Sequence, residues 1–119
     1  MVKVWLVDAT PQADGDIKEI VRFYLDKEGP EIAQGVLNRI TKAKDDLQTL
    51  PDRGRIPPEL KRMGVFAYRE IQIPPYRMFY EVNELDSKVY VHLVVDGRRD
   101  LPDLLAERLL GVLPGDDAL

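Results

Sequence analysis

Two amphipathic helical patterns follow one another with only Gly29 and Pro30 between them. Apolar residues recur three or four positions apart over residues 17–25 and again over residues 32–50. Such a short connection makes two helices lie antiparallel, with their apolar stripes facing a common neighbour. The sequence therefore predicts a helical hairpin that must be covered by another layer of structure.

One β-prone segment precedes this hairpin and three follow it. The first, Lys3–Val7, is followed by Thr10 and Pro11, a pair typical of a helix N-cap and the first helical residue. Two prolines at 74–75 and the turn residues 83–87 separate the later segments, which favours consecutive antiparallel hairpins. The later segments are Phe66–Ile73, Tyr76–Val82 and Lys88–Val95.

The remaining segments complete an α+β fold in the order β-α-α-β-β-β-α, with the helical hairpin on one face of an antiparallel sheet. Residues 51–64 show no periodicity and are predicted to form a basic loop. A last helix is expected between Asp100, as its cap, and Gly111. We expect residues 1–111 to form one domain and residues 112–119 a flexible tail. The leucines expected to complete the core from the last helix, rather than to be displaced by a partner, are Leu101, Leu104, Leu105 and Leu109.

The residue types that the chain lacks exclude several kinds of chemistry. It has no cysteine, so disulfides, Cys-ligated metals and thiol catalysis are excluded. Its single histidine, His92, argues against a His-rich metal site or a catalytic triad. We expect no cofactor and no metal. No apolar run is long enough to span a bilayer and no secretory signal opens the chain, so a cytoplasmic protein without membrane contact is expected.

Positive charge is concentrated in the middle of an acidic chain. The formal net charge is -4, so we expect no direct binding of DNA by this chain alone. Residues 51–82 instead carry six cations against four anions, a net of +2. An anionic partner should meet this region. Its cations are Arg53, Arg55, Lys61, Arg62, Arg69 and Arg77.

Strand alternation divides the predicted sheet into an apolar and a mixed face. Pairing Ile73 with Tyr76 turns one set of side chains toward the helical hairpin. That set is Ile71, Ile73, Tyr76, Met78, Tyr80, Val82, Val89, Val91, Leu93 and Val95. The opposite set is Tyr68, Glu70, Gln72, Arg77, Phe79, Glu81, Tyr90, His92 and Val94. We expect this second face to be an open binding platform with Arg77 in solvent, so that its replacement by alanine would leave the fold intact.

Several local motifs, taken in order, resemble the RelE/ParE superfamily of toxins from bacterial type II toxin–antitoxin systems. Residues 50–55 (Leu-Pro-Asp-Arg-Gly-Arg) are similar to a segment that follows the second helix in that family. Residues 68–71 and 75–82 resemble its paired strands, and residues 94–101 resemble its "V-x-H-G-R-R-D" ending. The resemblance extends from about Trp5 to Leu110.

The resemblance implies one of two activities. RelE-like members cut mRNA on the ribosome without metal, whereas ParE-like members inhibit DNA gyrase and are not known to hydrolyse anything. RNA cleavage requires a base, an acid and a cation for the phosphorane. Arg77 matches the nuclease arginine, but Asp96 stands where a histidine is common. Further groups that a nuclease would have to use are Lys61, Arg62, Glu70 and His92.

These considerations favour a ParE-like toxin that is not itself an enzyme. Three interpretations stay open. A gyrase inhibitor neutralised by a cognate antitoxin is preferred, a ribosome-dependent endoribonuclease is the alternative, and an inactive member that only binds a partner is the third. The antitoxin is expected to fold an apolar segment onto this chain. The residues expected to bind the target are Arg53, Arg55, Lys61, Arg62, Arg69, Arg77, Arg98 and Arg99.

Overall fold

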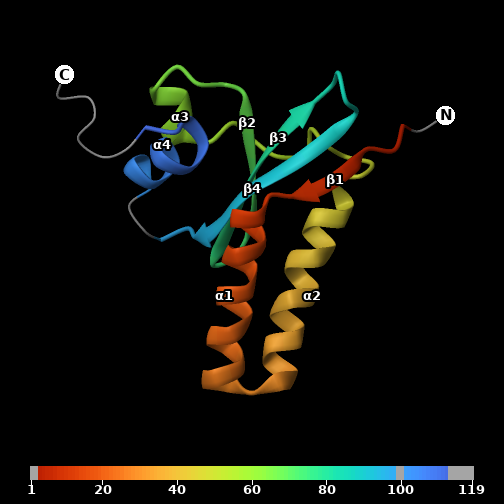
Figure 1. The fold of residues 1–119 in the computed structure, drawn as a ribbon, viewed down its shortest axis with the longest axis vertical. Coiled ribbons are helices and arrows are strands. Elements are labelled where there is room, and N and C mark those ends of the chain that lie inside the picture. Colours follow the sequence, from red (N-terminus) through yellow and green to blue (C-terminus); the bar gives the residue numbers. More distant parts are fainter. Residues whose placement is uncertain (1–2, 99–100, 113–119) are drawn as a thin grey trace.

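The computed structural model describes residues 3–98 and 101–112, which form a four-stranded sheet with helices on both faces (Figure 1). The sheet order is β1-β4-β3-β2, with β1 parallel to β4 and the other pairs antiparallel. The α+β class, the helical hairpin and the meander of the last three strands are confirmed, and the parallel pairing of β1 makes the sheet mixed. The strands are β1 (Leu6–Ala9), β2 (Tyr68–Ile73), β3 (Tyr76–Asn83) and β4 (Lys88–Asp96). The helices are α1 (Pro11–Glu28), α2 (Pro30–Asp46), α3 (Pro58–Arg62) and α4 (Pro102–Leu110).

The helical hairpin starts and turns where the sequence predicts. The Thr10 hydroxyl accepts a hydrogen bond from the Ala13 N–H at 3.1 Å, which caps α1. Gly29 has a φ of 92°, a backbone conformation that favours glycine, and its N–H bonds back to the last turn of α1. In Figure 1 the two helices run side by side and project beyond the sheet. The second helix ends at Asp46 rather than near Leu50, because the chain turns there and buries Leu47.

The hairpin packs on one face of the sheet as predicted. The pairing of β2 with β3 has Ile73 opposite Tyr76 and Ile71 opposite Met78, which is the predicted register. The side chains of this face join those of the helices in one apolar cluster. Its buried members are Ala13, Val36, Ile40, Leu47, Ile71, Ile73, Met78, Tyr80, Val89, Val91 and Val94.

A β-bulge in β4 places the side chains of residues 93–95 on the opposite faces of the sheet from those predicted. Tyr80 pairs with Val91 and Phe79 with Leu93, so His92 is an extra residue without an opposite partner. Because one inserted residue reverses the alternation, Leu93 and Val95 lie on the second face and Val94 on the hairpin face. The prediction for these three residues was wrong.

The second face of the sheet is not an open platform. Helices α3 and α4 cover part of it and form a second apolar cluster with the sheet. Phe79, expected in solvent, is fully buried in this cluster. Leu101, Leu105 and Leu109 complete the core, as predicted, whereas Leu104 is only partly buried against it. The sequence did not predict α3. The buried members are Leu60, Phe79, Leu93, Val95, Leu101, Leu105 and Leu109.

Some predicted features fall at the edge of the described chain. The first strand is Leu6–Ala9 rather than Lys3–Val7. The helix α4 ends at Gly111, in a left-handed conformation, as predicted. Asp100, Arg99 and residues 113–119 of the expected tail lie outside the described residues. None of the helices described is both long and apolar enough to cross a bilayer.

Candidate functional site

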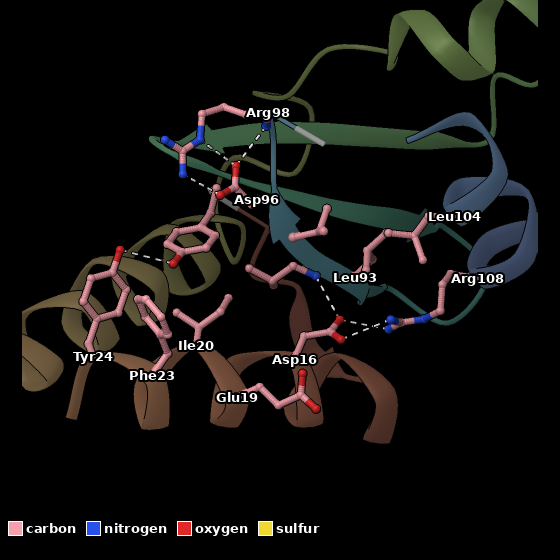
Figure 2. Close-up of a pocket in the computed structure, with 13 residues that line it drawn as sticks. Asp16, Glu19, Ile20, Phe23, Tyr24, Leu93, Asp96, Arg98, Leu104 and Arg108 are labelled. Atoms are coloured by element: carbon pink, nitrogen blue, oxygen red, sulfur yellow. Dashed lines mark hydrogen bonds and ion pairs between the residues drawn. The ribbon is translucent and has the colours of Figure 1, made fainter. Parts of the chain in front are cut away.

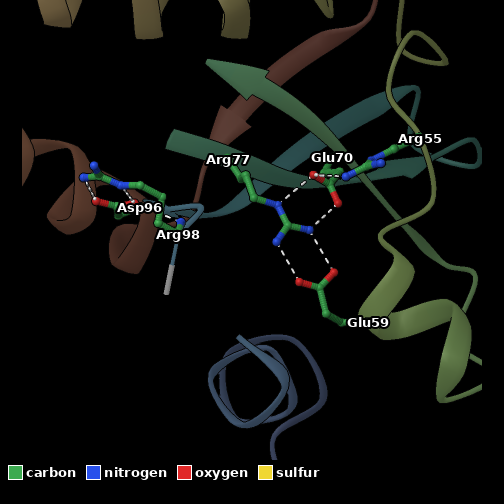
Figure 3. A network of polar contacts seen from close by, with 6 residues as sticks. All are labelled: Arg55, Glu59, Glu70, Arg77, Asp96 and Arg98. Carbon is green, nitrogen blue, oxygen red and sulfur yellow. Dashed lines mark hydrogen bonds and ion pairs between the residues drawn. The ribbon is translucent and has the colours of Figure 1, made fainter. Parts of the chain in front are cut away.

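Arg77, the residue expected to point into solvent, is the centre of a buried ionic cluster (Figure 3). Its Nε and Nη2 donate to the two carboxylate oxygens of Glu70 at 2.8 and 2.5 Å. Its Nη1 and Nη2 donate to the carboxylate of Glu59 at 2.6 and 2.8 Å. Only 9% of Arg77 and 1% of Glu70 is exposed. The guanidinium is therefore held by two carboxylates at once, in the paired geometry in which arginine binds them most strongly.

Three separate elements bring the members of this cluster together. Glu70 lies on β2 opposite Phe79, so it is a diagonal neighbour of Arg77 on β3. Glu59 comes from α3, a helix with Pro58 at its first position, a residue that suits a helix start. Below the guanidinium, the ring of Phe79 lies 4.9 Å from the Arg77 Cζ. Sequence alternation could not show this, because it places Glu70 and Arg77 on the open face without revealing α3.

The glycine of the turn after β4 is required for the packing around Arg77. A Cβ on Gly97 would lie only 2.6 and 2.7 Å from the Cδ and Cγ of Arg77. The Gly97 N–H also donates to the Pro75 carbonyl at 2.8 Å. This turn therefore lies directly against the alkyl part of Arg77 and closes the cluster on that side.

The electrostatics of the cluster stabilise the charged forms of Arg77 and Glu59. Hydrogen bonds from Arg77 lower the pKa of Glu59, and hydrogen bonds to Glu59 and Glu70 raise the pKa of Arg77. Two carboxylates outnumber one guanidinium, and the balance is restored by Arg55, whose Nη2 lies 3.6 Å from Glu70 Oε1. Removing the central cation would therefore leave buried negative charge without compensation.

Glu59 is expected to make the stability of the protein depend on pH in acid. The ordinary pKa of this carboxyl is 4.5 and the folded protein lowers it. Its contribution is therefore fully present above the unfolded pKa and is lost as the pH falls through the lower folded pKa. Urea unfolding of wild type and Glu59→Gln between pH about 7 and about 3 measures this.

The variant Glu59→Gln should be less stable than wild type at neutral pH and should lose stability less steeply in acid. Glu84→Gln, in the exposed turn after β3, is the matched control and should follow the wild-type curve. Equal acid slopes for Glu59→Gln and wild type would show that the Glu59 carboxylate contributes nothing.

The basic loop before α3 is fastened to the edge of the sheet. The Tyr80 hydroxyl donates to the Pro51 carbonyl at 2.7 Å and accepts from the Gly54 N–H at 3.0 Å. Arg69 donates to the Gly54 carbonyl at 2.8 Å. Arg55 and Glu70 exchange both backbone hydrogen bonds, which adds a short bridge beside β2. The residues of the 50–55 motif thus hold the loop in place.

Most cations expected to bind a target already have partners within the chain. Arg53 bonds to Asp46 at 3.1 Å, and Arg69 lies 3.8 Å from Asp52. Arg98 pairs with Asp96 at 2.7 Å (Figure 3). Arg99 lies outside the described residues. The exposed cations of α3, Lys61 and Arg62, do not belong to any of these pairs.

His92 belongs to a different group from Arg77. Its Nε2 lies 3.0 Å from Glu81 Oε1, and its ring meets that of Tyr68 edge-on, with 5.6 Å between centroids. The Tyr68 hydroxyl in turn donates to the Leu109 carbonyl at the end of α4. The structure therefore does not bring His92 together with Arg77, Lys61 and Arg62 as a nuclease centre would require.

A groove of about 500 Å³ lies between α1, α4 and the part of β4 that is not paired with β1 (Figure 2). Asp16 of α1 and Arg108 of α4 form an ion pair across it at 2.9 Å. Asp16 also accepts from the Val94 N–H, and Arg108 donates to the His92 carbonyl. These two side chains satisfy backbone groups that no neighbouring strand pairs at this end of β4. Sequence reasoning missed both residues.

No group of three or more metal-ligating side chains with suitable geometry occurs within residues 3–98 and 101–112.

Comparison with known proteins agrees with the fold and the motifs. The family model of the ParE toxin of type II toxin–antitoxin system, parDE, matches residues 7–101. The chain belongs to the ParE toxin family. The matched region contains the three residues of the ionic cluster, Glu59, Glu70 and Arg77, and the loop of residues 50–55.

Two solved structures resemble this ParE-family toxin. The chromosomal ParDE toxin–antitoxin system from P. aeruginosa matches with a TM-score of 0.66 and 18% identity, covering 79% of this chain and 97% of that one. The toxin–antitoxin complex RelBE2 from Mycobacterium tuberculosis matches with a TM-score of 0.57 and 19% identity, covering 81% and 93%. At these identities the likeness shows the fold. No curated protein is similar enough to count as a match.

Proposed function

We propose that this ParE-family toxin inhibits growth by binding DNA gyrase, rather than by cutting RNA, and that a cognate antitoxin neutralises it. The observation that carries the proposal is the state of Arg77. A metal-independent ribonuclease needs a cation free to stabilise charge that develops on the phosphorane. Here the matching guanidinium makes four hydrogen bonds to two carboxylates and is buried.

The other groups that a nuclease would need support the same choice. His92 pairs with Glu81 away from the cluster, and Glu70 has no exposed carboxylate with which to accept a proton from RNA. Freeing Arg77 for a phosphate would leave two carboxylates unpaired beside the incoming anion, which electrostatics opposes. An inhibitor that acts by binding makes no such demand on Arg77.

An antitoxin partner is supported by the relatives and by an exposed surface. The two similar structures are both toxin–antitoxin complexes. The groove between α1 and α4 offers apolar side chains, among them Phe23 and Leu104, beside the polar edge of β4 (Figure 2). Such a mixture suits an amphipathic protein segment.

The test uses the purified chain in two reactions. We expect it to inhibit supercoiling by purified gyrase and to leave mRNA intact in an in vitro translation reaction read by primer extension. Adding the cognate antitoxin should restore supercoiling. Ribosome-dependent cuts without any effect on gyrase would contradict the proposal and assign the RelE-like activity. Absence of both effects, together with normal growth of cells that express the chain alone, would leave only the inactive binding partner.

A further inference from the structure

The outer side of α3 and the segment that follows it combine two cations with two large apolar side chains. We call Lys61, Arg62, Met63 and Phe66 the α3 surface. Met63 is 43% and Phe66 59% exposed, and both cations are exposed. Large apolar groups gathered beside charges on a small protein often mark an interaction site.

The inner side of α3 holds this surface in one orientation. Leu60 is fully buried in the second apolar cluster, and Glu59 is bound to Arg77 by two hydrogen bonds. After the helix, the Val65 N–H donates to the Leu60 carbonyl at 2.9 Å. Because adjacent residues are anchored in this way, the neighbouring side chains of the α3 surface are presented outward at little further cost in entropy.

The end of α4 extends the apolar part of this region. Tyr68, two residues after Phe66, donates its hydroxyl to the Leu109 carbonyl at 2.9 Å, so the chain entering β2 passes beside that end. Leu110, the last residue of α4, and Val112, just after the helix, are 36% and 44% exposed. Figure 1 shows α3 and α4 as neighbours at the end of the sheet opposite the tip of the helical hairpin.

Lys61 and Arg62 of the α3 surface differ from the other cations of residues 51–82 because they form no ion pair with a carboxylate of the described chain. Among the described residues, no carboxylate lies within 4.0 Å of the Lys61 or Arg62 charge, whereas the guanidinium groups of Arg53, Arg55 and Arg69 each have one. Arg62 lies close enough to Glu59 to help lower the pKa of that carboxyl, but neither Lys61 nor Arg62 forms an ion pair among the described residues, so both can bind a partner's carboxylates.

We propose that the α3 surface is where this toxin binds its protein target, and that it takes an acidic, amphipathic segment of that target. Carboxylates of the segment would face Lys61 and Arg62, and its apolar side chains would cover Met63 and Phe66. This inference rests on the proposed function in one respect: it requires that the toxin acts by binding a protein. A nucleic acid fits less well, because two cations on a chain of net charge -4 neutralise few phosphates.

The experiment compares two double charge reversals for binding to immobilised gyrase at low and high salt. Lys61→Glu/Arg62→Glu changes the α3 surface, and Lys18→Glu/Lys27→Glu changes two exposed lysines of α1 as the matched control. We expect the first variant to bind at least about tenfold more weakly at low salt, with added salt no longer weakening its binding because salt screens the new repulsion, and the control to bind like wild type. Phe66→Ser should weaken binding about tenfold at either salt concentration, because it removes apolar contact.

Folding and antitoxin binding are measured on the same variants. All of these residues are exposed, so the melting temperature should stay near that of wild type, and the antitoxin should still bind. Gyrase binding by Lys61→Glu/Arg62→Glu equal to wild type would overturn the inference. So would loss of antitoxin binding with gyrase binding retained, or binding that disappears when nucleic acid is digested.

Failure of the proposed function gives a different result from failure of this inference. If the wild-type chain inhibits growth without binding gyrase, the proposed target is wrong, and growth inhibition becomes the readout for the α3 surface. Relief of that inhibition by Lys61→Glu/Arg62→Glu, but not by the α1 control, supports the inference if the wild-type chain leaves mRNA intact in the translation reaction, and ribosome-dependent cuts that this variant abolishes overturn it. Full inhibition by the α3 variant overturns it.

Discussion

Replacing Arg77 by alanine is expected to lower the free energy of unfolding by about 3–5 kcal/mol, because it leaves the carboxylates of Glu59 and Glu70 buried without their cation. This is a large share of the roughly 5–15 kcal/mol that stabilises a typical domain. Urea unfolding at neutral pH measures the loss. A strand residue in solvent would give almost none, which is the result that sequence alternation alone predicts.

Two further variants separate the role of charge from that of packing. Arg77→Met/Glu70→Gln removes one buried negative charge together with the cation and should be more stable than Arg77→Met. Arg22→Ala, on the exposed side of α1, should change stability by less than about 0.5 kcal/mol. If Arg77→Ala unfolds at the same urea concentration as Arg22→Ala, the cluster does not stabilise the fold. If Arg77→Ala is destabilised as expected, a loss of growth inhibition in this variant reflects unfolding and not a lost contact with the target.

Gly54→Ala is expected to destabilise the protein by about 2–3 kcal/mol through a clash with the backbone. The added Cβ would lie 2.5 Å from the Glu70 carbonyl oxygen and 2.6 Å from the Tyr80 hydroxyl. Neither neighbour can move freely, because the first belongs to β2 and the second bonds to Pro51. The loop must therefore shift, with loss of the hydrogen bonds that fasten it to the sheet.

Gly35→Ala is the matched control for this substitution. Gly35 lies inside α2 and an added Cβ there would meet nothing within 4 Å. Alanine should stabilise the helix by roughly 0.5–1 kcal/mol. Thermal unfolding of the two variants should therefore shift in opposite directions. A shift of Gly54→Ala to higher temperature would contradict the close approach of the loop to β2.

The elements that the sequence predicted well are those with a local signal. The helical hairpin has a regular apolar period, an N-cap at Thr10 and a stop at Gly29. The register of β2 and β3 follows from the short connection between Ile73 and Tyr76. Each of these signals involves residues close together in the chain, so no knowledge of distant partners was needed.

The features that were missed depend on residues distant in sequence. Helix α3 has only five residues, too few for a periodic pattern, and it is held by Leu60 and by the contact of Glu59 with Arg77, 18 positions away. The alternation of apolar and polar residues in β4 does not reveal the bulge at His92, yet the bulge turns the side chains of the following residues to the opposite faces of the sheet. Two consecutive prolines before a Glu-Leu pair were the one available sign of α3.

The sequence by itself determined the α+β class, the helical hairpin, the meander and the resemblance to RelE/ParE toxins, because these follow from local periodicity, turn residues and ordered motifs. The tertiary structure decided that Arg77 lies in a buried ionic cluster and that helices also cover part of the second face of the sheet. The physical reason is that alternation tells which side of a strand a residue occupies, whereas its exposure depends on what else packs there. Arg77 is covered by the short helix α3, whose Glu59 carboxylate pairs with the Arg77 guanidinium.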